Sequence, residues 1–158
     1  MEKNIDFTEV SSIKFGKAVI AGLIGTLAMT IVMLMAPLMG MPPMPIGKML
    51  AGFMDIPEVL GWIAHFMIGT VLALIYVYIF ASLLKGNGFV RGAVYGLVPW
   101  FVAQIMVNPM MGAGFFAANT PSPFLMVMGS LIGHLVYGAV LGGVYGNDNE
   151  FKTVQSKT

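Results

Sequence analysis

The chain contains no cysteine and few charged residues, and both absences limit what it can be. Without cysteine it forms no disulfide, no thiolate metal site and no cysteine-ligated iron–sulfur cluster. Charged residues make up 9% of its 158 residues, whereas soluble domains carry about 25%, so a surface facing water cannot be assembled. The net charge of +1 offers no basic footprint for a nucleic acid. Because 58% of the residues are hydrophobic, we expect the chain to lie in a lipid bilayer.

Long stretches of the chain have no charged residue at all. The intervals free of Asp, Glu, Lys and Arg are 18–47, 59–84 and 92–147. A helix that crosses a membrane needs about 20 mostly apolar residues, so the first two intervals hold one span each. The third is long enough for two, separated by the polar segment NTPSP at 119–123. The sequence therefore predicts an all-α, four-helix transmembrane bundle in a single domain, residues 1–158. The predicted spans are 18–39, 59–84, 89–111 and 124–145.

The basic residues are distributed unequally between the two sides of this bundle. Only Lys48 falls in an outer loop. The others fall on the opposite side, and they are Lys3, Lys14, Lys17, Lys85, Arg91, Lys152 and Lys157. Because Lys and Arg are enriched in the cytoplasmic loops of membrane proteins, both termini are predicted to be cytoplasmic. The protein is then a multi-pass protein of the cell (inner) membrane.

Proline and acidic residues mark where helices begin or change. The sequence DIPE at 55–58 resembles a capping box with proline in the first turn, and predicts the start of the second span. Pro99 lies inside the third span, where it removes one backbone hydrogen bond, so we expect a bend. The outer segment 39–54 is expected to form a proline-fixed turn followed by a short interfacial helix.

Parts of the chain match each other when the sequence is shifted. A shift of 69 superposes residues 61–76 on 130–145, and shifts of 72 and 74 pair 37–40 with 109–112 and 17–23 with 91–97. The pairs at the first shift include His65 with His134, Gly69 with Gly138, and Tyr76 with Tyr145. Together the matches predict a helical hairpin present twice, as a parallel repeat. The alternative is that the abundant Gly, Leu and Val match by composition alone.

Two histidines and two amides are the polar side chains that stand out inside the spans. By the helical rise, His65 lies about 10 Å below the outer end of its span. Gln104 and Asn108 reach a comparable depth on one helix face, and His134 lies somewhat deeper. Because ionisable residues in a span usually face the bundle interior, we expect these four side chains to form a polar patch in its outer half.

Three interpretations of the histidines stay open. In the first they are neutral and hydrogen-bond between helices that pack closely through small residues. In the second, His65 and His134 are the axial ligands of a b-type haem, and Gly69 and Gly138 leave room for the flat ring. In the third, histidine nitrogen and methionine sulfur bind copper, because thioethers favour Cu(I). The chain has 15 methionines, although methionine also fills irregular gaps in packing. Those of the outer face are Met39, Met41, Met44, Met49, Met54, Met110 and Met111.

The sequence offers no recognised catalytic motif. It has no serine–histidine–acid set, no zinc-binding helix motif and no glycine-rich phosphate loop, and no Asp or Glu lies inside a predicted span. We therefore expect a protein that is not an enzyme, serving as an accessory or structural subunit of a larger membrane complex. Its partners would be other membrane subunits or copies of itself. The alternative is a haem-binding electron-transfer protein ligated by His65 and His134.

Three segments carry a resemblance to a known family. They are GWIAHFMIGT at 61–70, NPMMGAGFF at 108–116 and GHLVYGAVLGGVYG at 133–146. The chain resembles a family of small bacterial four-helix membrane proteins that has no assigned function. The resemblance touches the second, third and fourth spans and implies a protein of the bacterial inner membrane. It implies no catalytic residue.

Overall fold

The computed structural model describes residues 7–146. Of the basic residues used above to predict the orientation, Lys3, Lys152 and Lys157 lie outside this range. The described residues form helices joined by short turns, without a β-strand.

The first half of the chain contains two long helical rods and one short helix. The first rod is α1 (Phe7–Met35), which a 3₁₀ turn extends to Met39. The short helix expected after the prolines is α2 (Ile46–Met54). The second rod begins as α3 (Glu58–Ile75), continues through a π-helical segment (Tyr76–Phe80) and ends as α4 (Ala81–Leu83).

The second half contains the other two rods. The third begins as α5 (Gly88–Val102), continues through a π-helical segment (Ala103–Val107) and ends as α6 (Asn108–Met110). After a 3₁₀ turn (Phe115–Ala117), α7 (Pro123–Tyr145) forms the fourth rod.

Four stretches of these rods are long and apolar enough to cross a membrane. They are Lys14–Met39, Glu58–Leu83, Gly88–Met110 and Pro123–Tyr145. The first begins four residues before the predicted span, and the other bounds differ from the predicted ones by no more than one residue. The predicted all-α fold with four apolar helices is confirmed.

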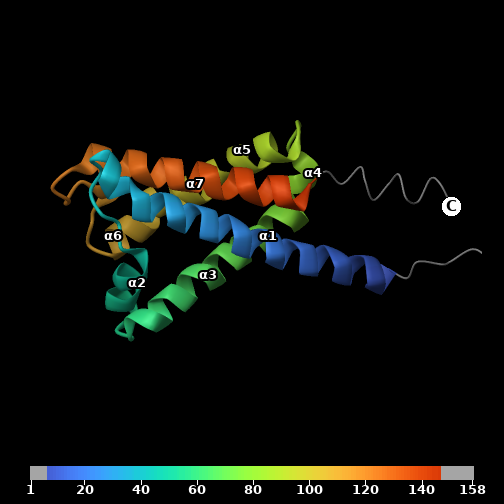
Figure 1. Cartoon of the computed structure of the whole chain (residues 1–158), viewed down its shortest axis with the longest axis horizontal. Helices are drawn as coiled ribbons and strands as arrows, with labels where there is room; N and C mark the ends of the chain where they lie inside the picture. The colour runs from blue at the N-terminus through green and yellow to red at the C-terminus, as the bar shows by residue number, and fades with distance from the viewer. Residues whose placement is uncertain (1–6, 147–158) are drawn as a thin grey trace, which may run out of the picture.

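The two hairpins pack differently. α5 and α7 lie along each other, and α1 packs against both α7 and α3. Figure 1 shows α3 crossing α1 at an angle, so that the start of α3 and the neighbouring α2 diverge from α7. The second hairpin is therefore closed, whereas the first opens toward the end that carries α2.

Glycine allows the close contact between α5 and α7. A Cβ atom on Gly92 would collide with the carbonyl oxygen of Gly138, and one on Gly142 would collide with that of Gly88. The two backbones touch because no side chain separates them. At the crossing of α1 and α3, a Cβ on Gly22 would lie 2.7 Å from the Cβ of Ala73. Both hairpins thus pack through small residues.

The first and third rods end in the same kind of turn. Gly40 and Gly112 have left-handed backbone conformations, with φ of 78° and 82°. Their N–H groups donate to the carbonyl oxygens of Pro37 and Pro109, each at 3.1 Å. These residues are paired by the shift of 72. The similarity is consistent with a duplicated hairpin, which stays a prediction.

Two local predictions meet different outcomes. The expected capping box before α3 was wrong: Asp55 adopts a left-handed conformation that ends α2, and α3 begins after Pro57 without a side-chain cap. The bend expected at Pro99 stays a prediction, because α5 remains α-helical through Pro99 as far as Val102. The π-helical segment begins four residues after Pro99, where the N–H of Ala103 donates to the carbonyl oxygens of Pro99 and Trp100.

The interior of the bundle is small, and much of the apolar surface is exposed. The largest buried side chains include Tyr76, Tyr95, Tyr137 and Tyr145, none more than 2% exposed. Outward-facing residues such as Leu34 (63%) and Met67 (63%) are instead largely exposed. Apolar patches of this extent are unusual on soluble monomers, and lipid would cover them.

Basic side chains gather where α4 and α7 end and α5 begins. Arg91 is 7% exposed and donates to the carbonyl oxygens of Ala81 at 2.7 Å and Gly146 at 3.1 Å. Lys17 of α1 lies over the ring of Tyr145, 5.6 Å from its centroid. Lys48, on α2, belongs to the opposite end.

Candidate functional site

His65 lies on α3 and is held by α1. Its side chain is 8% exposed, and its Nε2 atom lies 3.1 Å from Oγ1 of Thr30. The hydroxyl of Thr30 already donates its one proton to the carbonyl oxygen of Thr26, at 2.7 Å. Thr30 can therefore only accept from His65, so Nε2 carries the proton and Nδ1 of the neutral ring carries a lone pair.

His134 lies on α7, and its hydrogen bond is local. Its Nδ1 atom is 2.8 Å from the carbonyl oxygen of Ser130, one turn earlier. Because a carbonyl oxygen only accepts, Nδ1 of His134 must donate, and Nε2 of the neutral ring carries the lone pair. The hydroxyl of Ser130 lies farther away, 3.5 Å from the same nitrogen.

The two amides of the predicted patch reach His134 through Ser130. Asn108 donates to Oε1 of Gln104 at 2.9 Å, and Gln104 donates to the hydroxyl of Ser130 at 3.2 Å. Gln104 is 1% exposed, so this bond satisfies a fully buried amide. The structure thus brings Gln104, Asn108 and His134 into one hydrogen-bonded run, whereas His65 belongs to a separate one with α1.

The two histidine-bearing helices are nevertheless held together. One turn beyond each histidine, the hydroxyl of Tyr137 on α7 donates to the carbonyl oxygen of Gly69 on α3, at 2.6 Å. One turn of α1 also lies beside both histidines, because Thr30 contacts His65 and Met29 packs against Gly133, the neighbour of His134. The two imidazoles share no hydrogen bond in the described part of the chain, so neither unprotonated nitrogen is occupied by the other ring.

The glycines one turn from the histidines are packing positions. A Cβ on Gly69 would collide with the hydroxyl of Thr26, and one on Gly138 would collide with the carbonyl oxygen of Gly92. The room that the haem interpretation places at these glycines is taken by neighbouring helices. A macrocycle would need α3 to separate from α1, and α7 from α5.

Methionine, whose thioether sulfur can bind a metal ion, is the other candidate ligand near the histidines. Met29, Met33 and Met44 are buried, each no more than 8% exposed. Met29 and Met33 pack where a Cβ of Gly133 would stand, at 3.3 and 3.7 Å, and Gly133 adjoins His134 in sequence. Among the described residues, no group of three or more His, Asp or Glu side chains gathers to hold a metal ion.

Comparison with known proteins adds a family but no activity. The model of a family of unknown function, DUF6789, matches residues 13–155. The chain belongs to DUF6789. No curated protein and no solved structure matches this DUF6789 chain. Membership confirms the resemblance to an uncharacterised family, and the matched range includes both histidines of the DUF6789 protein.

Two partners in this site were not predicted from the sequence. Ser130 stands four residues before His134, a spacing that places two side chains on one helix face, so it was recognisable in principle. Thr30 has no such signal, because its contact with His65 depends on the angle at which α1 and α3 cross.

Proposed function

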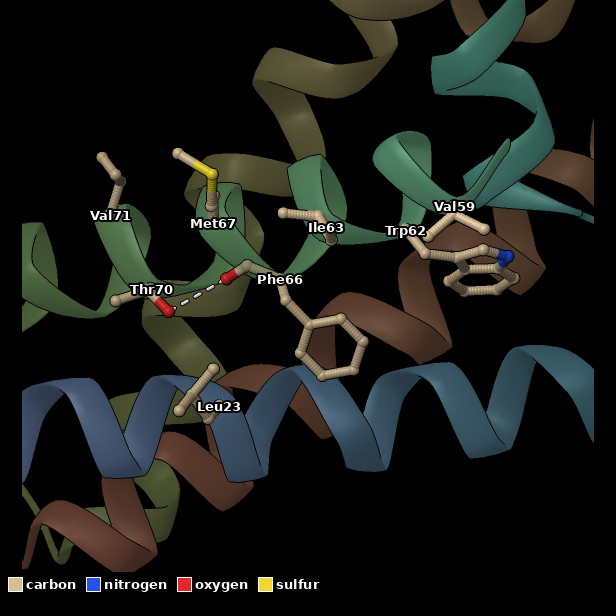
Figure 2. A pocket seen from close by; sticks show the side chains of 8 residues that line it. All are labelled: Leu23, Val59, Trp62, Ile63, Phe66, Met67, Thr70 and Val71. Atoms are coloured by element: carbon tan, nitrogen blue, oxygen red, sulfur yellow. Dashed lines mark hydrogen bonds between the residues drawn. The ribbon is translucent and has the colours of Figure 1, made fainter. Parts of the chain in front are cut away.

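We propose that this protein is a non-enzymatic accessory or structural subunit of a larger membrane assembly, embedded in a bacterial inner membrane. The observation that carries the proposal is an apolar groove between α1 and the outer half of α3. Its volume is about 540 Å³, and it is lined by Leu23 of α1 and by seven residues of α3 between Val59 and Val71. Figure 2 shows Phe66 reaching toward α1 and Leu23 reaching toward α3.

The chemistry of the groove favours an apolar occupant. Its one hydroxyl, on Thr70, donates to the carbonyl oxygen of Phe66 at 2.9 Å and is thereby satisfied within α3. The only other polar side-chain atom among the eight lining residues is the indole nitrogen of Trp62, so the groove offers little with which to orient a polar substrate. Side chains of a neighbouring transmembrane helix suit such a surface, since helices associate in lipid through close packing.

The arrangement of charge supports a particular orientation. Lys17 and Arg91 lie at the end of the bundle where α7 ends, and Lys48 lies toward the other. The rule that cytoplasmic loops carry more Lys and Arg supports placing the first end, and with it both termini, in the cytoplasm. The groove would then open in the outer half of the membrane.

Site-specific photo-crosslinking tests the accessory role. A photoreactive amino acid at Ile63, in the groove, is compared with one at Val94 on α5, because the two positions are similarly exposed (49% and 46%). In the native membrane, Ile63 should crosslink to a discrete protein partner that co-purifies stoichiometrically in mild detergent, and Val94 should not. Crosslinking of both positions to lipid alone, with a protein that purifies as a lone monomer, would contradict the proposal.

The haem alternative receives no support from the packing described here. Thr26 and Gly92 fill the space beside Gly69 and Gly138. A Soret band in protein purified from haem-replete cells would nevertheless establish haem binding, so the visible spectrum is the decisive measurement.

A further inference from the structure

The two histidines each present one nitrogen that the protein does not use. The hydrogen bonds to Thr30 and Ser130 occupy Nε2 of His65 and Nδ1 of His134. Among the described residues, Nδ1 of His65 and Nε2 of His134 have no hydrogen-bond partner. Both are lone pairs on neutral rings, which are the form in which imidazole binds a metal ion.

The surroundings of these nitrogens select the charge of the ion. No Asp or Glu lies inside the four apolar stretches beyond Glu58, at the very start of α3. A divalent ion would bring two positive charges into this interior without a carboxylate to offset them, which is strongly unfavourable. A monovalent ion carries half that charge. Of the metals that imidazole binds, Cu(I) is the monovalent one that also accepts thioether sulfur.

Two buried methionine thioethers lie on α1, the helix that packs against both α3 and α7. Met29 and Met33 are 8% and 7% exposed and stand on either side of Thr30, the hydrogen-bond partner of His65. Both also pack against Gly133 of α7, the neighbour of His134. One turn of α1 therefore contacts both histidine helices and carries two soft donors at that level.

We propose that Nδ1 of His65 and Nε2 of His134 bind a single Cu(I) ion, with the sulfur of Met29 or Met33 as a third ligand. Binding requires no loss of a proton and no change of oxidation state, because both nitrogens are unprotonated and copper arrives as Cu(I). The hydrogen bonds to Thr30 and Ser130 orient the rings, as such bonds do for histidine ligands generally. The exposed methionines of the outer face take no part.

Matched substitutions can remove each free nitrogen while keeping the hydrogen bond beside it. In His65→Gln the amide nitrogen can replace Nε2 as the donor to Thr30, and in His134→Asn it can replace Nδ1 as the donor to Ser130. Controls are Met39→Leu and Met110→Leu, at exposed positions (76% and 63%). The full chain in detergent is titrated anaerobically with Cu(I) against a chromophoric Cu(I) chelator.

The wild-type protein should take up one Cu(I) per chain, and each histidine variant should lose affinity by at least about a hundredfold, since even residues that only orient a ligand are worth about 10- to 100-fold. The control variants should bind as the wild type does. Failure of the wild type to compete for Cu(I) would overturn the proposal. So would wild-type affinity in both histidine variants, which would place any copper on the outer methionines.

A second measurement needs no variant, in case a histidine variant does not fold. Cu(I) added to ¹⁵N-histidine-labelled wild-type protein should shift the resonances of His65 Nδ1 and His134 Nε2 most strongly. Unchanged resonances at saturating Cu(I) would overturn the site. Because Trp62 and Phe66 stand between His65 and the groove, with ring centroids 6.1 and 5.7 Å from its own, this site and the accessory role can fail independently.

Discussion

The hydroxyl of Tyr137 and the carbonyl oxygen of Gly69, 2.6 Å apart, tie α7 to α3 across the interior of the bundle. A second tyrosine makes a similar bond from α5, where the hydroxyl of Tyr95 donates to the carbonyl oxygen of Leu72 at 2.7 Å. Direct packing between α3 and these two helices is otherwise limited. The two hydroxyls therefore contribute much of what holds α3 against α5 and α7.

Tyr137→Phe should lower the free energy of unfolding by about 0.6 kcal/mol, and by no more than about 2 kcal/mol, the range for hydrogen bonds between membrane helices. The change keeps the ring and removes only the donor. Tyr78→Phe is the control, because Tyr78 is 54% exposed. Reversible unfolding in mixed detergent micelles measures both. Equal stabilities of the two variants would show that the Tyr137 bond does not hold α3.

Gly92→Ala should destabilise the protein by about 1–3 kcal/mol, the usual cost of overpacking. The added methyl group would strike the carbonyl oxygen of Gly138, and backbone cannot move aside as a side chain can. Gly16→Ala is the control, because nothing lies within 4 Å of its Cβ position. That variant should be neutral or more stable, since alanine favours helix by up to about 1 kcal/mol over glycine. Thermal unfolding in detergent distinguishes the two, and matching losses would contradict the packing.

Gly40→Ala and Gly112→Ala should each lower the free energy of unfolding by about 1 kcal/mol, and the two losses should be similar. Nothing lies within 4 Å of either Cβ position, so the cost comes only from the left-handed backbone. Asparagine tolerates that conformation better, so Gly40→Asn and Gly112→Asn should cost less. The free energies of unfolding of the four variants test the expectation. A large difference between the two sites would weaken the case for equivalent turns.

The two histidines should be opposite tautomers in the metal-free protein. The proton should reside on Nε2 of His65 and on Nδ1 of His134, because of their bonds to Thr30 and Ser130. The ¹⁵N chemical shifts of the ring nitrogens report this directly. Thr30→Val should disturb the assignment at His65 and leave His134 unchanged. The same tautomer at both histidines would refute the hydrogen-bond pattern.

Labelling of single cysteines should reveal the orientation, and the chain suits it because it has no cysteine of its own. Lys48→Cys, on α2, should react with a membrane-impermeant maleimide in intact cells. Lys85→Cys, between α4 and α5, should react only after lysis. Both side chains are exposed, so a difference in labelling reflects the side of the membrane. The reverse pattern would invert the proposed orientation.

The four apolar helices were predictable because lipid imposes a severe condition on a sequence. A charge-free interval such as 59–84 has few other uses, so its length and limits nearly define the helix. The bond between Asn108 and Gln104 was also within reach, since it joins residues four apart on one helix. Both inferences depend only on neighbours in sequence.

Contacts between helices were not predictable in the same way. Arg91 was interpreted only as a marker of the cytoplasmic side, yet its guanidinium is buried on carbonyl oxygens at the ends of two other helices. Gly69 and Gly138 show the same limit on prediction from sequence. The space beside a glycine can stay open for a ligand, or a neighbouring helix can fill it. Which occurs depends on where Thr26 and Gly92 lie, and the spacing of residues does not contain that information.

The contact of α5 with α7 has a mechanical consequence. Where Gly92 meets Gly138, backbone touches backbone, so no rotamer change can loosen it, and the two helices would move as one rigid body. The segment before α2 instead touches α7 through Met41 and Met44, whose unbranched thioethers adapt readily. If a partner or an ion distorts this protein, α2 and the first half of α3 would absorb the distortion while α5 and α7 serve as the fixed frame.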